Sequence, residues 1–405
     1  MSTTEIDDRQ AAQLRDIENA ASVLERAEAL AGFFESQARE AEDLGRLPDR
    51  TVEVMKEAQV VRLLQPKRYG GHEAHPVDFA KAVIAIGARC GAAGWVAGVV
   101  GVHPHELALA DPRVQEEIWG GDVNTWVASP YAPMGVAKPV EGGFVFNGHW
   151  KFSSGTDGCD WVIIGGFVAH PDGTPNREDI RHFILPRRDY EILQDSWQVS
   201  GLKGTGSKDL VVKDAFVPEY RVVPGMIEDL WGAARAVGLE APVYAVPRAV
   251  MFAGTINTGT LALAQGALGA FIAHTRTRSN AAGPASQNMV QLQVLGEAAA
   301  DIELSIEKQL TDFSRVYDHV ATGRNAPLEL VVEVRRNQVR NTHRALAAVD
   351  NLFLHAGGAA LHLDQPLQRF WRDMHAAMNH MCNVAEPVYG NYSLNLFGHP
   401  VIGRV

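Results

Sequence analysis

One stretch of the sequence combines hydroxyl groups, a glycine and aromatic side chains in an order that could hold a flat ligand. Residues 144–161 read FVFNGHWKFSSGTDGCDW. The first part alternates apolar and polar side chains as a half-buried strand does, and Asn147-Gly148 predicts a tight turn between two strands. Ser153-Ser154-Gly155 follows, and a glycine there lets the backbone approach a ligand closely. We therefore expect a sheet wall that presents hydroxyl and backbone amide groups to a planar cofactor.

A second candidate for chemistry is the histidine of Gly-Val-His-Pro-His-Glu, at residues 101–106. His103 ends a run of small apolar residues that predicts a buried helix, and an imidazole there could act as a general base. Two other interpretations stay open. His103 could bond the free carbonyls at the helix end, or it could bind a metal together with His105. The metal interpretation is the weaker one, because no third ligand stands at a known spacing.

Composition and charge limit the classes of function. The 405 residues include 37 basic and 48 acidic side chains, and the formal charge of −11 is spread along the chain, so we expect no nucleic-acid partner. Cys90, Cys159 and Cys382 lie far apart without a CxxC pair, which argues against a disulfide framework and a zinc site. The first residues are polar and acidic, and no apolar run suggests a membrane span. We expect a cytoplasmic protein without a membrane partner.

The period of the apolar residues divides the chain into three domains. Residues 1–123, from about Arg9 onward, repeat apolar side chains at spacings of three and four, which predicts an N-terminal helical domain. Residues 124–224 change to a period near two, which predicts a middle β domain of barrel or sandwich type. Residues 225–405 predict a C-terminal bundle of four helices with a preceding lid loop. The expected fold class is mainly α with an inserted β domain.

Two loop predictions bear on function. Gly225–Pro247 shows the least regular pattern and predicts a loop over the substrate pocket. Gly201–Ser207 is rich in glycine but does not read GxGxxG at the start of a helix, so a Rossmann dinucleotide site is not supported.

The order of helices, strands and a helical bundle resembles the acyl-CoA dehydrogenase fold over nearly the whole chain. The resemblance rests on Trp150–Gly155, on Gly201–Ser207 followed by Asp214–Pro218, and on Gln368–Asp373. Dehydrogenases of this fold need a carboxylate base, commonly in a YEGT-like segment after the last of these motifs. The corresponding region here starts at His375 and lacks that segment.

This departure resembles the two-component flavin monooxygenases of the same fold, which hydroxylate phenols such as hydroxyphenylacetate, the phenolic ring of degraded steroids, or polyketide quinones. The matching segments are Leu64–Pro66 with Gly70-Gly71, Gly91–Trp95 leading to His103, Ser129–Met134, Ser153–Gly155, Gly204–Ser207 and Phe370–His375.

The resemblance implies a reaction and its partners. A separate flavin reductase would supply diffusible reduced FMN or FAD, which reacts with O2 to a C4a-hydroperoxide, and the distal oxygen would hydroxylate a small phenolic substrate ortho to its hydroxyl group. The resemblance also implies a homotetramer, and it implies no metal.

The resemblance assigns roles to residues at matching positions. Ser154, with Ser153 as the alternative, would bond the flavin N5 region, and His375 would lie near the flavin C4a edge. His103 and Ser129 would face the substrate hydroxyl, and Tyr131 would stack beside the substrate. For each of these, a turn, core or packing role is the plain alternative.

Further positions would contact the flavin itself. Phe152 would form a wall of the site, and Thr205 and Ser207 would lie beside the cofactor. Arg278 would contact a flavin phosphate across a subunit boundary. Gly357 and Gly358 would let a neighbouring subunit approach the flavin, although close helix packing explains the same glycines.

Two alternative functions stay open from the sequence. One is an acyl-CoA dehydrogenase that oxidises an acyl thioester. The other is a monooxygenase of the same fold that oxidises nitrogen or sulfur, for which His103 and Ser129 would not be needed as a pair.

Overall fold

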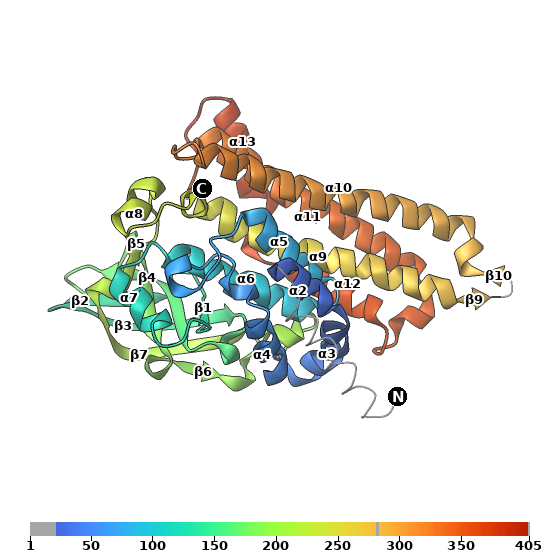
Figure 1. Ribbon diagram of the computed structural model, residues 1–405, viewed down its shortest axis with the longest axis horizontal. Coiled ribbons are helices and arrows are strands. Elements are labelled where there is room, and N and C mark those ends of the chain that lie inside the picture. Colours follow the sequence, from blue (N-terminus) through green and yellow to red (C-terminus); the bar gives the residue numbers. More distant parts are fainter. Residues whose placement is uncertain (1–21, 281–282, 404–405) are drawn as a thin grey trace.

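The computed structural model describes residues 22–280 and 283–403, and its elements follow the order helices, sheet, helices (Figure 1). The helical pattern predicted from Arg9 to Ala21 lies outside the described residues. The helices that precede the sheet are α2 (Val23–Ala29), α3 (Ala31–Leu44), α4 (Asp49–Glu57), α5 (Pro76–Gly87), α6 (Gly91–Leu107) and α7 (Pro112–Trp119).

Helix α6 is the centre of the N-terminal part. All 17 of its residues are buried, because Gly, Ala and Val leave no polar face along most of its length. It packs against α5 and against the long helix α9 (Arg248–Thr277). Glycines allow this close approach: a Cβ on Gly94 would lie 2.2 Å from the Gly87 Cα. The C-terminal turn of α6, which carries His103, is thereby held rigidly inside the protein.

Eight of the strands form one mixed sheet, with the order β6-β7-β3-β2-β4-β5-β8 and with β1 paired to β4. Phe146 and Phe183, on strands that are not neighbours in this order, stack with ring centroids 4.2 Å apart, so the sheet curls around an aromatic core. The strands are β1 (Val127–Ala128), β2 (Gly135–Val140), β3 (Gly143–Ser153), β4 (Trp161–Ala169), β5 (Pro175–Pro186), β6 (Glu191–Leu193), β7 (Lys208–Pro218) and β8 (Val222–Pro224).

The predicted turn at Asn147-Gly148 is wrong, because both residues lie inside β3. Opposite them the register between β3 and β7 shifts, and Asp214 of β7 adopts a φ of 48°. The Asn147 amide donates to Asp214 Oδ1 at 3.0 Å, and the Asp214 backbone N–H donates to Asn147 Oδ1 at 2.8 Å. The Asn-Gly pair therefore faces a β-bulge and does not close a hairpin.

The segment predicted as a loop, Gly225–Pro247, is partly helical. It contains α8 and the short 3-10 helix η8, and the Asp229 side chain caps α8 by accepting from the Gly232 backbone N–H at 2.9 Å. The bounds are α8 (Leu230–Ala236) and η8 (Pro242–Ala245).

The C-terminal part consists of long helices beside α9 (Figure 1). α9 is long and apolar enough to cross a membrane by length and composition, contrary to the expectation from the sequence, yet 72% of its most apolar window is buried inside the protein. The remaining elements are the hairpin strands β9 (Ser279–Asn280) and β10 (Gly283–Pro284), then α10 (Met289–Val320), α11 (Leu328–His355), α12 (Pro366–Met378) and α13 (Ala385–Leu396).

Candidate functional site

Five rings from four separate segments lie in one continuous row, which we call the ring row. Neighbouring ring centroids are 5.6, 4.8, 6.3 and 6.0 Å apart along this row. The first ring lies in the C-terminal turn of α6, the second in the loop after β1 and the third in the first turns of α9. The fourth lies in the segment after α12, and the fifth lies in α6 again. The members of the row in this order are His103, Tyr131, Phe252, His380 and Trp95.

His103 offers a free acceptor nitrogen at one end of the row. Its Nδ1 lies 2.5 Å from the Val127 carbonyl oxygen, which can only accept, so Nδ1 carries the hydrogen. In the neutral ring, Nε2 therefore has a lone pair, and it has no partner among the described residues although it is buried. Burial lowers the pKa of His103 to about 4, against a weaker opposing effect of the Val127 carbonyl. His103 is thus a neutral base at physiological pH.

His380 has the opposite tautomer. Its Nδ1 accepts from the Cys382 backbone N–H at 3.2 Å, so the hydrogen of the neutral ring lies on Nε2. Burial, and then the positive charge of Arg335, lower the pKa of His380 to about 4. The row thus contains one histidine that accepts and one that donates. The sequence prediction did not select His380, and its only signal was a second histidine five positions after His375.

Ser154 joins the ring row through Trp95. The Trp95 indole N–H donates to Ser154 Oγ at 3.2 Å, and Ser154 Oγ lies 2.7 Å from Ser207 Oγ. Thr205 Oγ1 is 2.7 Å from Ser207 Oγ as well. The structure therefore brings the three predicted cofactor residues Ser154, Thr205 and Ser207 together, and their contact with a cofactor stays a prediction. These side chains are all buried.

A bulge in β3 places Phe152 and Ser153 on opposite sides. Trp150 pairs with Leu210 and Ser153 with Lys208, so two residues of β3 face a single residue of β7 between these pairs. Phe152 adopts a φ of 66°, which is uncommon for an aromatic residue, and its side chain is 67% exposed. Ser153 is fully buried and its Oγ has no partner among the described residues. The bulge thus presents a bare aromatic ring next to Ser154.

The loop after β1 places Ser129 and Tyr131. Ser129 follows β1 directly and is buried, and Tyr131 is half-buried. Burial, together with the negative charge of Glu106, holds the pKa of Tyr131 well above its ordinary value, so its phenol keeps its hydrogen and donates it to Glu106. Tyr131 meets His103 at an interplanar angle of 78°. Tyr131 thus lies beside His103, and Ser129 stands two residues before Tyr131 in the same loop.

A buried ionic group supports Tyr131, and no motif in the sequence pointed to this group. Burial opposes ionisation of Glu106, but the His182 ring and Arg248 hold the pKa of its carboxyl below the ordinary value. His182 Nδ1 bonds Glu106 Oε1, and Arg248 Nη1 lies 3.3 Å from Glu106 Oε2. The Arg248 guanidinium also lies over the Tyr131 ring at 4.8 Å. These side chains come from α6, β5 and α9, which are far apart in the sequence.

The structure does not bring His375 to the ring row. Its Nε2 lies 2.8 Å from Asp350 Oδ1 of α11, and the Trp371 indole N–H donates to the same oxygen at 2.8 Å. The side chain is 42% exposed. A role for His375 beside the cofactor receives no support from these contacts and stays a prediction.

Arg278, Gly357 and Gly358 lie at the opposite end of α9 from the ring row. Nineteen residues separate Gly259, which contacts Trp95, from Arg278, and a helix rises about 1.5 Å per residue, so about 28 Å lies between them. The Arg278 guanidinium bonds the Ala356 carbonyl of its own chain, next to Gly357, whose φ is 76°. The predicted phosphate contact of Arg278 could thus be made only in another subunit, and it stays a prediction.

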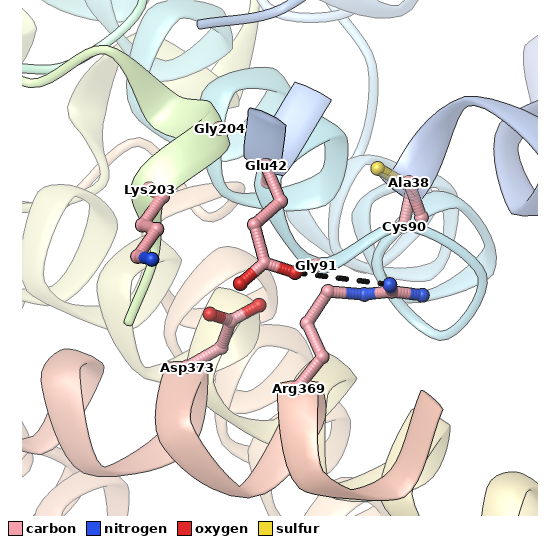
Figure 2. Close-up of a pocket in the computed structure, with 9 residues that line it drawn as sticks. Ala38, Glu42, Cys90, Gly91, Lys203, Gly204, Arg369 and Asp373 are labelled. Carbon is pink, nitrogen blue, oxygen red and sulfur yellow. Dashed lines mark ion pairs between the residues drawn. The ribbon is translucent and has the colours of Figure 1, made fainter. Parts of the chain in front are cut away.

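Two cavities lie elsewhere, and no residue of the ring row lines either of them. The smaller, shown in Figure 2, holds about 10 Å³ between α3, the 3-10 helix η6 (Lys203–Thr205) and α12. Glu42 and Arg369 form an ion pair of 3.9 Å there, and burial raises the pKa of Asp373 to about 6. The volume suits one water molecule and not a ligand. The larger, of about 270 Å³, is lined by Gly155, Thr205 and charged side chains of α4.

Within the described residues, no three His, Cys, Asp or Glu side chains gather as a metal ion would require. The interpretation of His103 and His105 as a metal pair is also wrong in geometry, because His105 Nε2 bonds the Val243 carbonyl at 2.9 Å while His103 bonds the Val127 carbonyl.

The chain is similar to known proteins over nearly its whole length. It is 44% identical to the pigment production hydroxylase of Rhodococcus erythropolis, over 93% of this chain and 96% of that protein. It is 40% identical to the flavin-dependent monooxygenase, oxygenase subunit HsaA, of Mycobacterium tuberculosis, over 94% and 97%. The p-hydroxyphenylacetate 3-hydroxylase, oxygenase component, of Acinetobacter baumannii is 30% identical, over 91% and 87%.

Solved structures and family models agree with this likeness. The crystal structure of 3-HSA hydroxylase from Rhodococcus sp. RHA1 superposes with a TM-score of 0.90 at 38% identity, over 95% of this chain and 99% of that one. Residues 255–384 match the family model "Acyl-CoA dehydrogenase, C-terminal domain". The predicted fold class is therefore confirmed.

Proposed function

The chain belongs to the family of oxygenase components of flavin-dependent monooxygenases with the acyl-CoA dehydrogenase fold, and on this basis we propose that it hydroxylates a phenol ortho to the hydroxyl group. The observation that carries the choice of substrate is the lone pair on His103 Nε2, which is buried and unpartnered. A phenol O–H is the kind of donor that this nitrogen lacks.

The residues around Ser154 fit a reduced flavin. The exposed ring of Phe152 and the indole of Trp197, with centroids 6.1 Å apart, offer an apolar wall to a planar ring system. Ser154 directly follows β3, the strand that carries Phe152, and offers a hydroxyl oxygen for the polar edge of the planar ring system. Bound reduced flavin would react with O2 and supply the oxygen atom for the substrate.

The ring row and its supports would prepare the phenol. His103 Nε2 accepts the phenol hydrogen, which places negative charge on the phenol oxygen and makes the ortho carbon electron-rich. Tyr131 packs beside His103 and is fixed by its bond to Glu106, so the substrate ring has a rigid aromatic neighbour. His380, the fourth ring of the row, presents an N–H that can donate to the oxygen that is transferred.

The proposal includes a partner protein and a diffusible cofactor. The relatives are named as oxygenase subunits or components, so we propose that a separate reductase delivers reduced FMN or FAD to this chain. The site residues described above supply no metal ligand in this scheme.

We also propose a homotetramer in the cytoplasm. Large apolar side chains are exposed on the C-terminal helices, among them Leu354 at 78% and Phe397 at 76%, and α13 buries none of its residues. Further copies of the chain would cover these surfaces. The three cysteines are unpaired, as suits a reducing compartment.

A pair of matched substrates tests the proposal. Chemically reduced FMN, and separately reduced FAD, is mixed with the protein and oxygenated buffer without any reductase, in the presence of either a phenol or its methyl ether. Mass spectrometry measures hydroxylated product over a panel of mono- and polycyclic phenols, and a peroxide assay measures uncoupled oxygen use. We expect an ortho-diphenol from a phenol and none from its ether, because the ether has no hydrogen for His103.

Equal hydroxylation of both compounds would refute the role of the phenol O–H. Absence of product from every phenol, together with reduction of bound oxidised flavin by an acyl-CoA, would instead favour a dehydrogenase.

A further inference from the structure

We propose that Glu42 and Asp373 share one hydrogen across a buried cavity and so form a latch, which holds the segment 201–207 against α3 and α12. Loss of this hydrogen opens the latch and releases the segment. The segment carries Thr205 and Ser207 of the candidate site, so the two acids are positioning residues for that site. The latch needs no bound flavin, and the inference therefore does not rest on the proposed function.

Two hydrogen bonds fix the start of this segment to α12. The Leu202 N–H donates to Asp373 Oδ1 at 2.6 Å. The Arg372 guanidinium donates to the Ser200 carbonyl, also at 2.6 Å, and a Cβ on Gly201 would lie 2.2 Å from the Arg372 carbonyl oxygen. Leu202 adopts a φ of 54°, where a residue with a Cβ is strained. The segment therefore keeps this shape only while the bond to Asp373 offsets the strain.

A second carboxyl group faces Asp373 across the water-sized cavity. Glu42 of α3 and Asp373 of α12 point toward each other there, as Figure 2 shows. Asp373 is 5% exposed, and the Glu42 side chain is 12% exposed. Two negative charges in so enclosed a place repel each other, which favours one proton held between the two groups.

The surrounding charges assign this proton to Asp373. Glu42 forms ion pairs with Arg372 at 2.6 Å and with Arg369 at 3.9 Å, whereas Asp373 forms none with the described residues. Burial, and to a smaller extent the charge of Glu42, raise the pKa of Asp373 to about 6. The Leu202 N–H and the two arginines oppose this shift without cancelling it.

Among the described residues that line the cavity, no other carboxyl group competes for the proton. Lys203 of η6 brings a positive charge to the cavity. Burial raises the pKa of the Cys90 thiol to about 11, so this group stays neutral. Gly91, the first residue of α6, leaves room for the acid, since a Cβ there would lie 3.1 Å from Asp373 Oδ2. The state of the latch thus depends on the proton of Asp373.

Glu42 offers an acceptor that a protonated Asp373 would fill. Glu42 Oε1 accepts from Arg372, but Oε2 is buried and has no hydrogen-bond partner among the described residues. A protonated Asp373 keeps one oxygen for the Leu202 N–H and donates its hydrogen toward Glu42 Oε2. It does so directly or through the one water that the cavity of about 10 Å³ can hold. The closed latch thereby joins α3, α12 and the segment.

Ionisation of Asp373 opens the latch. A buried carboxylate that faces Glu42 regains water only if it turns out of the cavity, and Leu202 then loses its acceptor. The pKa of Asp373 is about 6 in the closed latch, against an ordinary value of 3.8. Opening therefore becomes more favourable as the pH rises from 3.8 to about 6 and then levels off. These two pKa values predict that the opening equilibrium shifts about tenfold between pH 5 and pH 7.5.

Hydrogen–deuterium exchange measures this opening directly. The full-length protein without flavin is labelled at several pH values from 5 to 7.5, and mass spectrometry with gas-phase fragmentation resolves the Leu202 amide. After correction for the pH dependence of intrinsic exchange, we expect the protection of this amide to fall about tenfold over this range. Buried amides in the middle of α9, such as that of Leu261, exchange only when the whole fold opens and should stay protected.

Two variants change the latch, and a third is the matched control. Asp373→Asn cannot ionise and keeps both an acceptor for Leu202 and a hydrogen for Glu42, so its protection should not depend on pH. Glu42→Gln removes the facing charge and should show a smaller fall than the wild type. Asp43→Asn changes the neighbouring carboxylate of α3, whose side chain is 59% exposed and pairs with Arg39, so it should keep the wild-type fall.

Equal protection of Leu202 at pH 5 and pH 7.5 in the wild type would overturn the inference, and so would a full fall in Asp373→Asn. If Asp373→Asn does not fold, an undiminished fall in Glu42→Gln would overturn it in the same way. None of these measurements involves a flavin, so failure of the latch is distinguishable from failure of the proposed function.

Discussion

Replacement of His103 by asparagine tests the roles of its two ring nitrogens separately. The asparagine Nδ2 takes the position of the histidine Nδ1 and can keep the bond to the Val127 carbonyl, which is 2.5 Å in the structure. The acceptor Nε2 is lost. The expected result is a folded protein that still binds flavin and consumes oxygen, but releases hydrogen peroxide where the native protein forms product.

The magnitude follows from the role of a general base. Such a base contributes about 10²- to 10⁴-fold in rate, or about 3–5 kcal/mol at the transition state. Stability should change by no more than about 1 kcal/mol, because the variant loses ring packing but also removes a buried acceptor that had no partner. The loss of activity thus exceeds any loss of stability.

The assay measures diphenol and hydrogen peroxide formed per reduced flavin supplied, next to urea unfolding of the same samples. His105→Gln is the matched control. His105 lies on the same buried helix, and its Nε2 bonds the Val243 carbonyl at 2.9 Å, a contact that glutamine can retain. Native product yield in His103→Asn would remove His103 from the reaction.

Three further predictions concern pH and the two C-terminal histidines. Burial lowers the pKa of His105 from 6.5 to about 4, so the free energy of unfolding falls as the pH drops from 6.5 to 4. In His105→Gln this fall, measured by urea unfolding, should be smaller than in the wild type by up to about 3 kcal/mol. Asp373 has the opposite sign: burial raises its pKa from 3.8 to about 6, so ionisation destabilises the fold as pH rises through 4–6. Asp373→Asn keeps the acceptor for the Leu202 N–H, and its free energy of unfolding relative to the wild type should rise by up to about 3 kcal/mol between pH 4 and pH 7. The same difference between variant and wild type at both pH values would contradict a buried charge on Asp373. His380→Ala should slow the reaction of bound reduced flavin with O2 at least about tenfold in stopped-flow absorbance, whereas His375→Ala should change it less than about threefold; the reverse order would return the role to His375.

The sequence predicted the long elements well, because their periodic patterns persist over many turns. The helix predicted over Leu328–His355 has the same bounds in the structure, and the one predicted over Gly91–Leu109 ends two residues earlier. A helix of 28 residues repeats its apolar face often enough to be recognised without knowledge of its neighbours.

The misplaced turn and the unseen bulges have a different cause. A bulge depends on the register with a partner strand, which local sequence does not encode. Asn147-Gly148 is a good hairpin signal by itself, but Asp214 from another strand satisfies the Asn147 amide. The outward turn of Phe152 arises in the same way from its pairing with β7.

Candidate site residues could be named from the sequence where one short segment carries a motif, and they were missed where several segments meet. His103, Ser154 and Tyr131 stand in short motifs. The position of His380 depends on how the chain turns after α12 ends at Met378. The ionic group around Glu106 assembles from three distant elements, and no spacing in the sequence links them.

Transfer of an oxygen atom from O2 to a phenol is the central claim, and isotope labelling tests it most directly. The protein is mixed anaerobically with chemically reduced flavin and a phenol that the panel identifies as a substrate, and ¹⁸O2 is then admitted. The account predicts an ortho-diphenol that carries one ¹⁸O atom, as measured by mass spectrometry. A diphenol that carries only oxygen from water would contradict it.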